Sequence, residues 1–394
     1  MRDIAGRNAQ GAGTIRKKTV MRNGQAYTYW EARLTIGSDP GTGKQIQKSF
    51  SGKTQKEVRE KLQAAAVAVN DSTYLEPSKI TFGEWLKIWQ DDYIGDVKPL
   101  TVAAYKQSIR LYLTPNLGAI KLQSLTAVDI QKVYNKLTKG EKPLSAKTIK
   151  NLHGVCHRAL QQAVEIGYIR FNPSDACKLP RVEKHEMKPL DDEKIQAFMK
   201  TVSGHKYEYI YLVTLFTGMR EGEVLGLTWD CVDFDSNSIL INRQLQKMRD
   251  GSGYVLASTK SDKARRITAA PFVMNILKKQ QEKQNSEKKT AQDMWSNEWD
   301  LVFTNGLGEH LCAVTVYNCF KRICRDAGFE YTRFHDLRHS YAVAALRAGD
   351  DIKTVQSNLG HATASFTLDV YGHCTDQMKL ESANRMERFI SSLG

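Results

Sequence analysis

Two histidines, an arginine and a tyrosine near the C-terminus carry side chains that together could handle a phosphate ester. His335 and Arg338 stand three residues apart, so on a helix they would share one face. An arginine keeps its charge, and its planar fork matches the oxygens of a phosphate. His361 follows a Leu-Gly pair, and Tyr371, ten residues further on, is a phenol that attacks phosphorus only with assistance. These residue types, without a carboxylate pair or a metal cage, predict phosphoryl transfer through a covalent phosphotyrosine.

The strings that hold these residues resemble the C-terminal boxes of the tyrosine recombinases, the phage and conjugative-transposon integrases. The boxes in question are His-x-x-Arg-His from residue 335, Leu-Gly-His ending at 361, and the tyrosine at 371. Upstream, Thr-Gly-Met-Arg ending at Arg220 is similar to the first-arginine box, and Ser-Thr-Lys ending at Lys260 to the β-hairpin that carries the catalytic lysine. These boxes stand in the right order over roughly residues 185 to 390, which is a specific signal where one box would be weak.

The resemblance implies that two arginines and a lysine act directly on the scissile phosphate. Arg220 and Arg338 would bind the two non-bridging oxygens, where negative charge grows in the transition state. Lys260 would protonate the leaving 5′-oxygen, and Lys263 in the same turn is the alternative for that role. Glu223, three residues after Arg220, would hold that arginine or a neighbouring backbone donor in place.

The remaining roles fall to the histidines and the tyrosine. His335 would assist proton removal from Tyr371, and His361 would hydrogen-bond a non-bridging oxygen. The product would be a 3′-phosphotyrosyl enzyme that keeps the energy of the broken bond. We therefore expect no cofactor and no metal.

The charge of the chain points to nucleic acid. The 394 residues carry a net charge of +14, and residues 1–70 contain thirteen Lys or Arg against five Asp or Glu. Clustered positive charge without a membrane-type helix indicates DNA or RNA, although a basic face can also serve solubility alone. The sequence contains no stretch of about 18 apolar residues, so it predicts no membrane span. The seven cysteines are scattered and lack a C-x-x-C pair, which is typical of reduced thiols in a cytoplasmic, here bacterial, protein.

Residues 1–72 are predicted to form an N-terminal DNA-binding domain. Residues 14–20, 27–36 and 45–50 alternate in the manner of strands, and a helix follows from a capping box that begins at Thr54. Such a three-stranded sheet with one helix resembles the arm-binding domain of many integrases. The basic residues expected to contact arm-type DNA are Arg16, Lys17, Lys18 and Arg33.

Residues 78–172 are predicted to be helical and resemble the SAM-like core-binding domain of the same family. Four helices are expected, at 81–93, 100–113, 127–139 and 145–166, followed by an extended linker at 171–189. Along the last helix, the residues expected to meet phosphates of the core site are Lys147, Lys150 and Arg158.

Residues 185–394 are predicted to form an α+β catalytic domain. Its sheet is expected to be antiparallel and to consist of residues 239–242, 254–257 and 265–268, with Lys260 in the turn between the last two strands. Further DNA contacts are assigned to Lys263, Arg265 and Arg266. A final amphipathic helix, 378–393, would pack on a neighbouring protomer, as in the family, or on its own domain.

The fold class predicted from the sequence is thus multidomain and mainly α. The function that the resemblance implies is that of an integrase, which joins and excises the DNA of a mobile element. Single-strand exchange between two duplexes needs four active sites, so a homotetramer on double-stranded DNA is expected, with an excisionase or DNA-bending proteins as candidate partners. The alternatives are a type IB topoisomerase-like strand transferase and a DNA-binding regulator that has lost activity.

Overall fold

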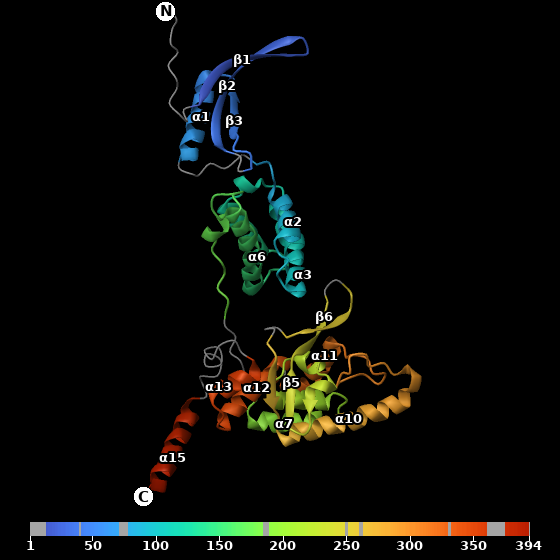
Figure 1. Cartoon of the computed structure of the whole chain (residues 1–394). Helices are drawn as coiled ribbons and strands as arrows, with labels where there is room; N and C mark the ends of the chain where they lie inside the picture. Colours follow the sequence, from blue (N-terminus) through green and yellow to red (C-terminus); the bar gives the residue numbers. More distant parts are fainter. Residues whose placement is uncertain are drawn as a thin grey trace, which may run out of the picture. The chain divides into compact units, whose positions relative to one another are not determined.

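The computed structural model describes residues 13–38, 41–70, 78–183, 189–248, 251–259, 263–329, 332–360 and 375–393 (Figure 1). The chain divides into two compact units, Met1–Glu183 and Lys184–Gly394. The first unit contains two hydrophobic cores, one for a small sheet and one for a helical body. The mainly helical, multidomain fold class predicted from the sequence is confirmed.

The small N-terminal sheet forms because a tight turn joins two long strands. β1 (Thr14–Arg22), β2 (Gln25–Ser38) and β3 (Gln45–Gly52) pair antiparallel in that order, and α1 spans Gln55–Asn70. Asn23 and Gly24 have φ of 47° and 78°, and two consecutive positive φ values suit a two-residue hairpin turn. Ala32 and Leu34 of β2 pack with Val58 and Leu62 of α1. The helix therefore covers one face of the sheet and leaves the other face open.

The helical body of the first unit is built around two buried tryptophans. Trp85 and Trp89 are at most 1% exposed, and the Trp85 indole donates to the Ala159 carbonyl at 2.8 Å. A π-helical turn at residues 109–113 interrupts the helix predicted at 100–113; it comes just before Pro115, which has no N–H to donate. The elements are α2 (Phe82–Asp92), α3 (Pro99–Ser108), η1 (Ile109–Leu113), α4 (Thr114–Leu117), η2 (Leu122–Ser124), α5 (Ala127–Lys139), α6 (Ala146–Glu165) and η3 (Pro173–Ala176).

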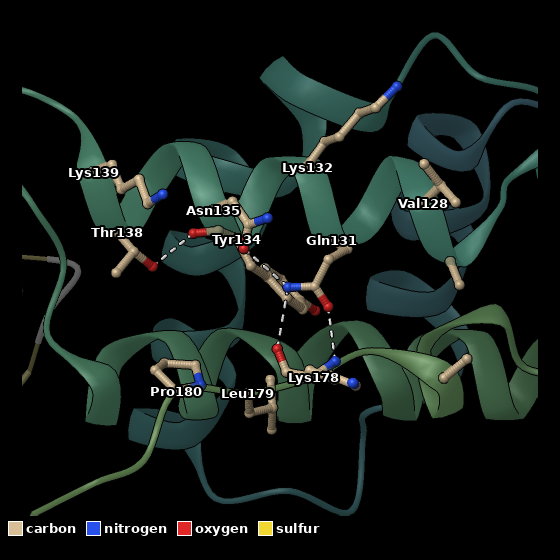
Figure 2. Close-up of a pocket in the computed structure, with 12 residues that line it drawn as sticks. Val128, Gln131, Lys132, Tyr134, Asn135, Thr138, Lys139, Lys178, Leu179 and Pro180 are labelled. Atoms are coloured by element: carbon tan, nitrogen blue, oxygen red, sulfur yellow. Dashed lines mark hydrogen bonds between the residues drawn. The ribbon is translucent and has the colours of Figure 1, made fainter.

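The segment after α6 is more ordered than the extended linker that the sequence predicts. Ser174 is fully buried, and its backbone N–H and hydroxyl both donate to the Asn172 side chain. Gln131 of α5 then binds the backbone of Lys178 on both sides, accepting from its N–H at 2.7 Å and donating to its carbonyl at 3.1 Å (Figure 2). Residues 172–180 therefore belong to the helical body, so the extended connection begins later than residue 171.

The second unit surrounds a larger core. Its elements are α7 (Asp192–Val202), α8 (Glu208–Thr217), α9 (Glu221–Leu225), η4 (Trp229–Cys231), β4 (Val232–Asp233), β5 (Ser238–Ile241), β6 (Arg243–Lys247), β7 (Tyr254–Ser258), β8 (Arg265–Thr268), α10 (Pro271–Ala291), η5 (Gln292–Met294), α11 (Ala313–Asp326), α12 (Phe334–Arg347), α13 (Ile352–Leu359) and α15 (Thr375–Leu393). α8 is apolar on almost every side and buried, with α7, α10 and α12 packed against it. This central helix ends where the candidate site begins.

The strand pairing of the second unit differs from the sequence prediction. β5 pairs with β4 and β8, whereas β7 pairs with β6 in a separate two-stranded sheet. The single antiparallel sheet predicted from residues 239–242, 254–257 and 265–268 is therefore wrong. The strand that the sequence analysis missed, β6, reads Arg-Gln-Leu-Gln-Lys, and its one apolar residue produces no strand signal.

Candidate active site

Arg220 stands at a sharp junction between two helices. α8 ends at Gly218, whose φ of 68° is left-handed, and a Cβ there would lie 2.5 Å from a ring carbon of Tyr341. Met219 is 1% exposed and anchors the turn, after which Arg220 forms the N-cap of α9. The Arg220 side chain is 24% exposed. The junction thus directs this guanidinium to the surface of the unit while its backbone stays fixed.

Glu223 binds Arg220 from the protein interior. Its carboxylate accepts from the Arg220 backbone N–H at 2.9 Å and from the Arg220 guanidinium at 2.6 Å. Arg265 of β8 donates to both oxygens of the same carboxylate, at 3.0 and 2.6 Å. Burial would raise the pKa of Glu223, but the hydrogen bonds and charge of Arg265, followed by those of Arg220, outweigh it and hold the pKa at about 2. Glu223 is therefore ionised at neutral pH and serves no proton transfer there.

Arg338 is a buried cation held by two helix ends. Its side chain donates to the Gly218 carbonyl at 2.6 Å and to the Leu359 carbonyl at 2.5 Å, and the residue is 1% exposed. These carbonyls lie at the C-termini of α8 and α13, where the helix dipole favours positive charge. Both helices end in a left-handed glycine, Gly218 and Gly360. Arg338 thus joins the segment before Arg220 to the end of α13.

His335 and His339 lie one turn apart on α12, with ring centroids 4.8 Å apart in an edge-to-face arrangement. The pKa of His335 is lowered because the surrounding protein desolvates the ring and because Arg338 and Arg220 add positive charge nearby. Burial, followed by the neighbouring His335, lowers the pKa of His339 to about 4. Arg338 and Arg220 thus lie close enough to His335 to contribute to its lowered pKa, and the imidazole is neutral near pH 7.

Three of the predicted catalytic residues, Lys260, His361 and Tyr371, lie outside the described residues. The segment holding Lys260 is flanked by buried Thr259, whose hydroxyl donates to the carbonyl of exposed Lys263 at 3.2 Å. His361 follows Gly360 in the sequence, and Gly360 follows Leu359, whose carbonyl Arg338 binds.

The predicted DNA-binding residues of the N-terminal sheet separate onto two faces. Arg16 pairs with Glu31 across the strands at 2.7 Å, Lys18 bonds the same carboxylate at 3.1 Å, and Arg33 lies 3.7 Å from it. These three share the face that α1 leaves open. Lys17 is opposite Trp30 in the register and lies on the face that packs on α1.

The remaining predicted DNA contacts lie on α6 and β8. Lys147, Lys150 and Arg158 are exposed along one side of α6, at intervals of three and eight residues. Arg266 is exposed and donates to the Ser238 hydroxyl at 2.8 Å. Arg265 is different: its side chain is 9% exposed and is engaged with Glu223 and the Asn358 carbonyl. It does not have the solvent-facing position that its predicted DNA contact needs.

Among the described residues, no group of three or more His, Cys, Asp or Glu could hold a metal ion. None of their helices is long and apolar enough to cross a membrane.

The family model described as "Phage integrase family" matches residues 188–378, and "Phage integrase, N-terminal SAM-like domain" matches residues 81–138. The chain belongs to the phage integrase family and is a tyrosine-type site-specific recombinase.

Several proteins and solved structures are similar to this chain over most of its length. A protein named "Tyrosine recombinase XerC-like" from Caldanaerobacter subterraneus is 28% identical over 391 residues, covering 94% of this chain and 98% of the relative. The ICEBs1 integrase of Bacillus subtilis is 23% identical over 378 residues, covering 93% and 98%. The Tn1549 transposon integrase in complex with circular intermediate DNA has a TM-score of 0.65 at 22% identity, covering 78% of this chain and 99% of that one. A lambda integrase dimer on a core site has a TM-score of 0.54 at 16% identity, covering 74% and 95%. The two structures share the fold.

Proposed function

We propose that this recombinase integrates and excises a mobile element by cutting and rejoining DNA strands through a 3′-phosphotyrosyl intermediate on Tyr371. The observation that carries the proposal is the convergence of Arg220, from the junction of α8 and α9, with His335 and Arg338, which both come from α12. Two guanidinium groups suit the two non-bridging oxygens of one phosphodiester, whose negative charge grows during attack. Arg220 is 24% exposed, whereas Arg338 is 1% exposed and binds the Gly218 and Leu359 carbonyls, so its contact to the phosphate requires it to exchange one of these partners.

In the proposed cleavage step, the Tyr371 oxygen forms a bond to phosphorus and the bond from phosphorus to the 5′-oxygen breaks. His335 assists removal of the phenol proton, for which a neutral imidazole is the competent form. Lys260 supplies the proton to the leaving 5′-oxygen, with Lys263 as the alternative, and His361 hydrogen-bonds a non-bridging oxygen. Attack by the 5′-hydroxyl of another strand reverses these steps and joins new partners.

We propose a division of DNA binding among three domains. Residues 1–72 bind arm-type sites through the open sheet face that holds Arg16, Lys18 and Arg33. Residues 78–172 bind the core site through the exposed basic side of α6, and residues 185–394 cut it. The described cysteines are all free thiols, which suits action on DNA in a bacterial cytoplasm. Excisionase or DNA-bending proteins are proposed as accessory partners.

We propose that four protomers assemble on DNA through α15. Every described side chain from residue 383 to 393 is exposed, and Met386, Phe389, Ile390 and Leu393 form an apolar stripe at helical spacing. The same unit has an apolar groove of 520 Å³ between α7, α8 and α12, lined by side chains such as Met199, Leu215, Phe216 and Ala344. A stripe and a groove on one chain allow α15 of one protomer to dock on the next. Phe389→Asp should then abolish the DNA-bound tetramer in light scattering while leaving single-site binding intact; an unchanged tetramer would contradict this docking.

A covalent-trapping assay tests the proposed chemistry. The protein is incubated in EDTA with nicked duplexes carrying element-end sequences, and an SDS-resistant protein–DNA adduct is sought. We expect an adduct with the native chain and none with Tyr371→Phe. An adduct that survives this substitution would move the nucleophile to another tyrosine. Tight, specific binding without any adduct would favour a regulator, and relaxation of supercoils without recombination would favour a topoisomerase.

A further inference from the structure

We propose that Arg265 is a positioning residue that neutralises Glu223, so that Arg220 keeps its positive charge for the DNA phosphate. This inference rests on the proposed function and assigns Arg265 a role other than DNA contact. Its side chain is 9% exposed, in contrast to exposed Arg266, the next residue of the same strand. Successive strand residues point to opposite faces, so only one of the pair can point inward.

Arg265 connects three elements with three hydrogen bonds. Its two terminal nitrogens bind the Glu223 carboxylate at 3.0 and 2.6 Å, which joins β8 to α9. Its Nε donates to the Asn358 carbonyl at 2.8 Å, which joins β8 to the last turn of α13. A lysine cannot reproduce this arrangement because it lacks the planar fork.

The contact to α13 is one of two parallel bridges. Arg338 binds the Leu359 carbonyl, so two guanidinium groups hold consecutive carbonyls at this helix end. Gly360 follows with φ of 63°, and a Cβ there would lie 3.0 Å from Cδ of Arg265. The two bridges therefore set the end of α13, which leads to His361, at a fixed place beside the Arg220 junction.

The charges around Glu223 explain why a second arginine is needed. One buried carboxylate paired with Arg220 alone would cancel much of the field that Arg220 exerts on a phosphate. With Arg265 bound bidentately to the same carboxylate, the three groups keep a net charge of about +1, and Arg220 is the partner that is 24% exposed. Arg265 thus leaves Arg220 both oriented by Glu223 and electrostatically available.

The test is a double-mutant cycle on the full chain with Arg265→Gln, Glu223→Gln and the double variant. Single-turnover formation of the covalent adduct on a nicked core site is measured, together with the dissociation constant of the same site. Arg265→Gln should slow adduct formation by about 100-fold, comparable to loss of one transition-state donor, with less than about a threefold change in binding. The double variant should be faster than Arg265→Gln alone, because the uncompensated carboxylate is gone.

A purely structural role predicts the opposite order. Two lost partners would then make the double variant as slow as Arg265→Gln or slower, and that outcome would overturn the proposal. Arg243→Gln is the matched control, since Arg243 of β6 also pairs with a carboxylate of the same unit, that of Asp230 in η4 at 3.3 Å. It should leave adduct formation within about twofold of native, as surface substitutions away from a site usually do.

Hydrogen exchange separates this inference from the proposed function. In DNA-free protein, Arg265→Gln should speed exchange in the last turn of α13, where the Gly360 N–H bonds the Ser357 carbonyl at 3.0 Å. The Arg243→Gln control should not change exchange there. If the native chain forms no adduct, the proposed function fails, while the exchange comparison still decides whether Arg265 holds α13. Unchanged exchange in Arg265→Gln would overturn the positioning role.

Discussion

Glu223→Gln removes the buried negative charge that binds Arg220 and Arg265 while preserving the shape of the side chain. The pKa of Glu223 is about 2, against an ordinary value of 4.5. A gap of about 2.5, at about 1.36 kcal/mol for each tenfold change, corresponds to about 3 kcal/mol of stability at neutral pH. Because the folded-state pKa lies below the unfolded value, this stabilisation is complete above about pH 5 and is lost as the pH falls toward 2.

The assay is urea unfolding of the native chain and the variant at several pH values between 7 and 3. Hydrogen-exchange mass spectrometry of peptides from α8 reports the second unit separately, which matters because a multidomain chain does not unfold in one step. At pH 7 the variant should be less stable by about 3 kcal/mol, and the difference should shrink as the pH falls below 5.

Glu282→Gln is the control, because Glu282 is exposed on α10 of the same unit and should change stability by less than about 0.5 kcal/mol. A loss below about 1 kcal/mol for Glu223→Gln at pH 7 would refute the assignment of Glu223 as the ionised centre of the arginine pair. A loss that stays constant down to pH 3 would refute the electrostatic origin of the effect.

Three further outcomes are expected. Gly218→Ala should destabilise the second unit by about 2 kcal/mol, since Gly218 has φ of 68° and a ring carbon 2.5 Å from a new Cβ; an unchanged urea midpoint would contradict this. Adduct formation should lose rate only below pH 6.5, because the lowered pKa of His335 keeps the ring neutral above it; a decline already above pH 7 would assign the base elsewhere. Arg16→Ala should weaken arm-site binding and reduce the salt slope by about 1, whereas Lys17→Ala, on the face toward α1, should change affinity less than about twofold.

Local signals in the sequence were sufficient for most of the elements. The Asn-Gly pair at 23–24 marks a hairpin because only certain residues tolerate consecutive positive φ values. The helix that begins at residue 82 follows from the Thr81–Glu84 capping box, and the breaks at Gly218 and Gly360 follow from the need for a left-handed cap. The boxes around Arg220 and Arg338 likewise indicated the family from the residues alone.

Pairing and facing were decided by the tertiary structure. β7 pairs with β6 in the folded chain. β6 has only one apolar residue, so its sequence has no alternating pattern from which this pairing could be predicted. The order of residues 172–180 depends on Gln131, which binds the backbone of Lys178, 47 residues later in the chain. Local sequence rules do not extend over such a separation.

Arg265 and Arg266 show most clearly what the sequence leaves undecided about the direction of a side chain. Both read as basic residues next to a predicted lysine turn, and the period of a strand places them on opposite faces without stating which face is inward. The sequence by itself determined that one of the two could point into the unit. The packing of β8 against α9 and the end of α13 decided that it is Arg265, because there a buried carboxylate and a helix-end carbonyl satisfy its charge.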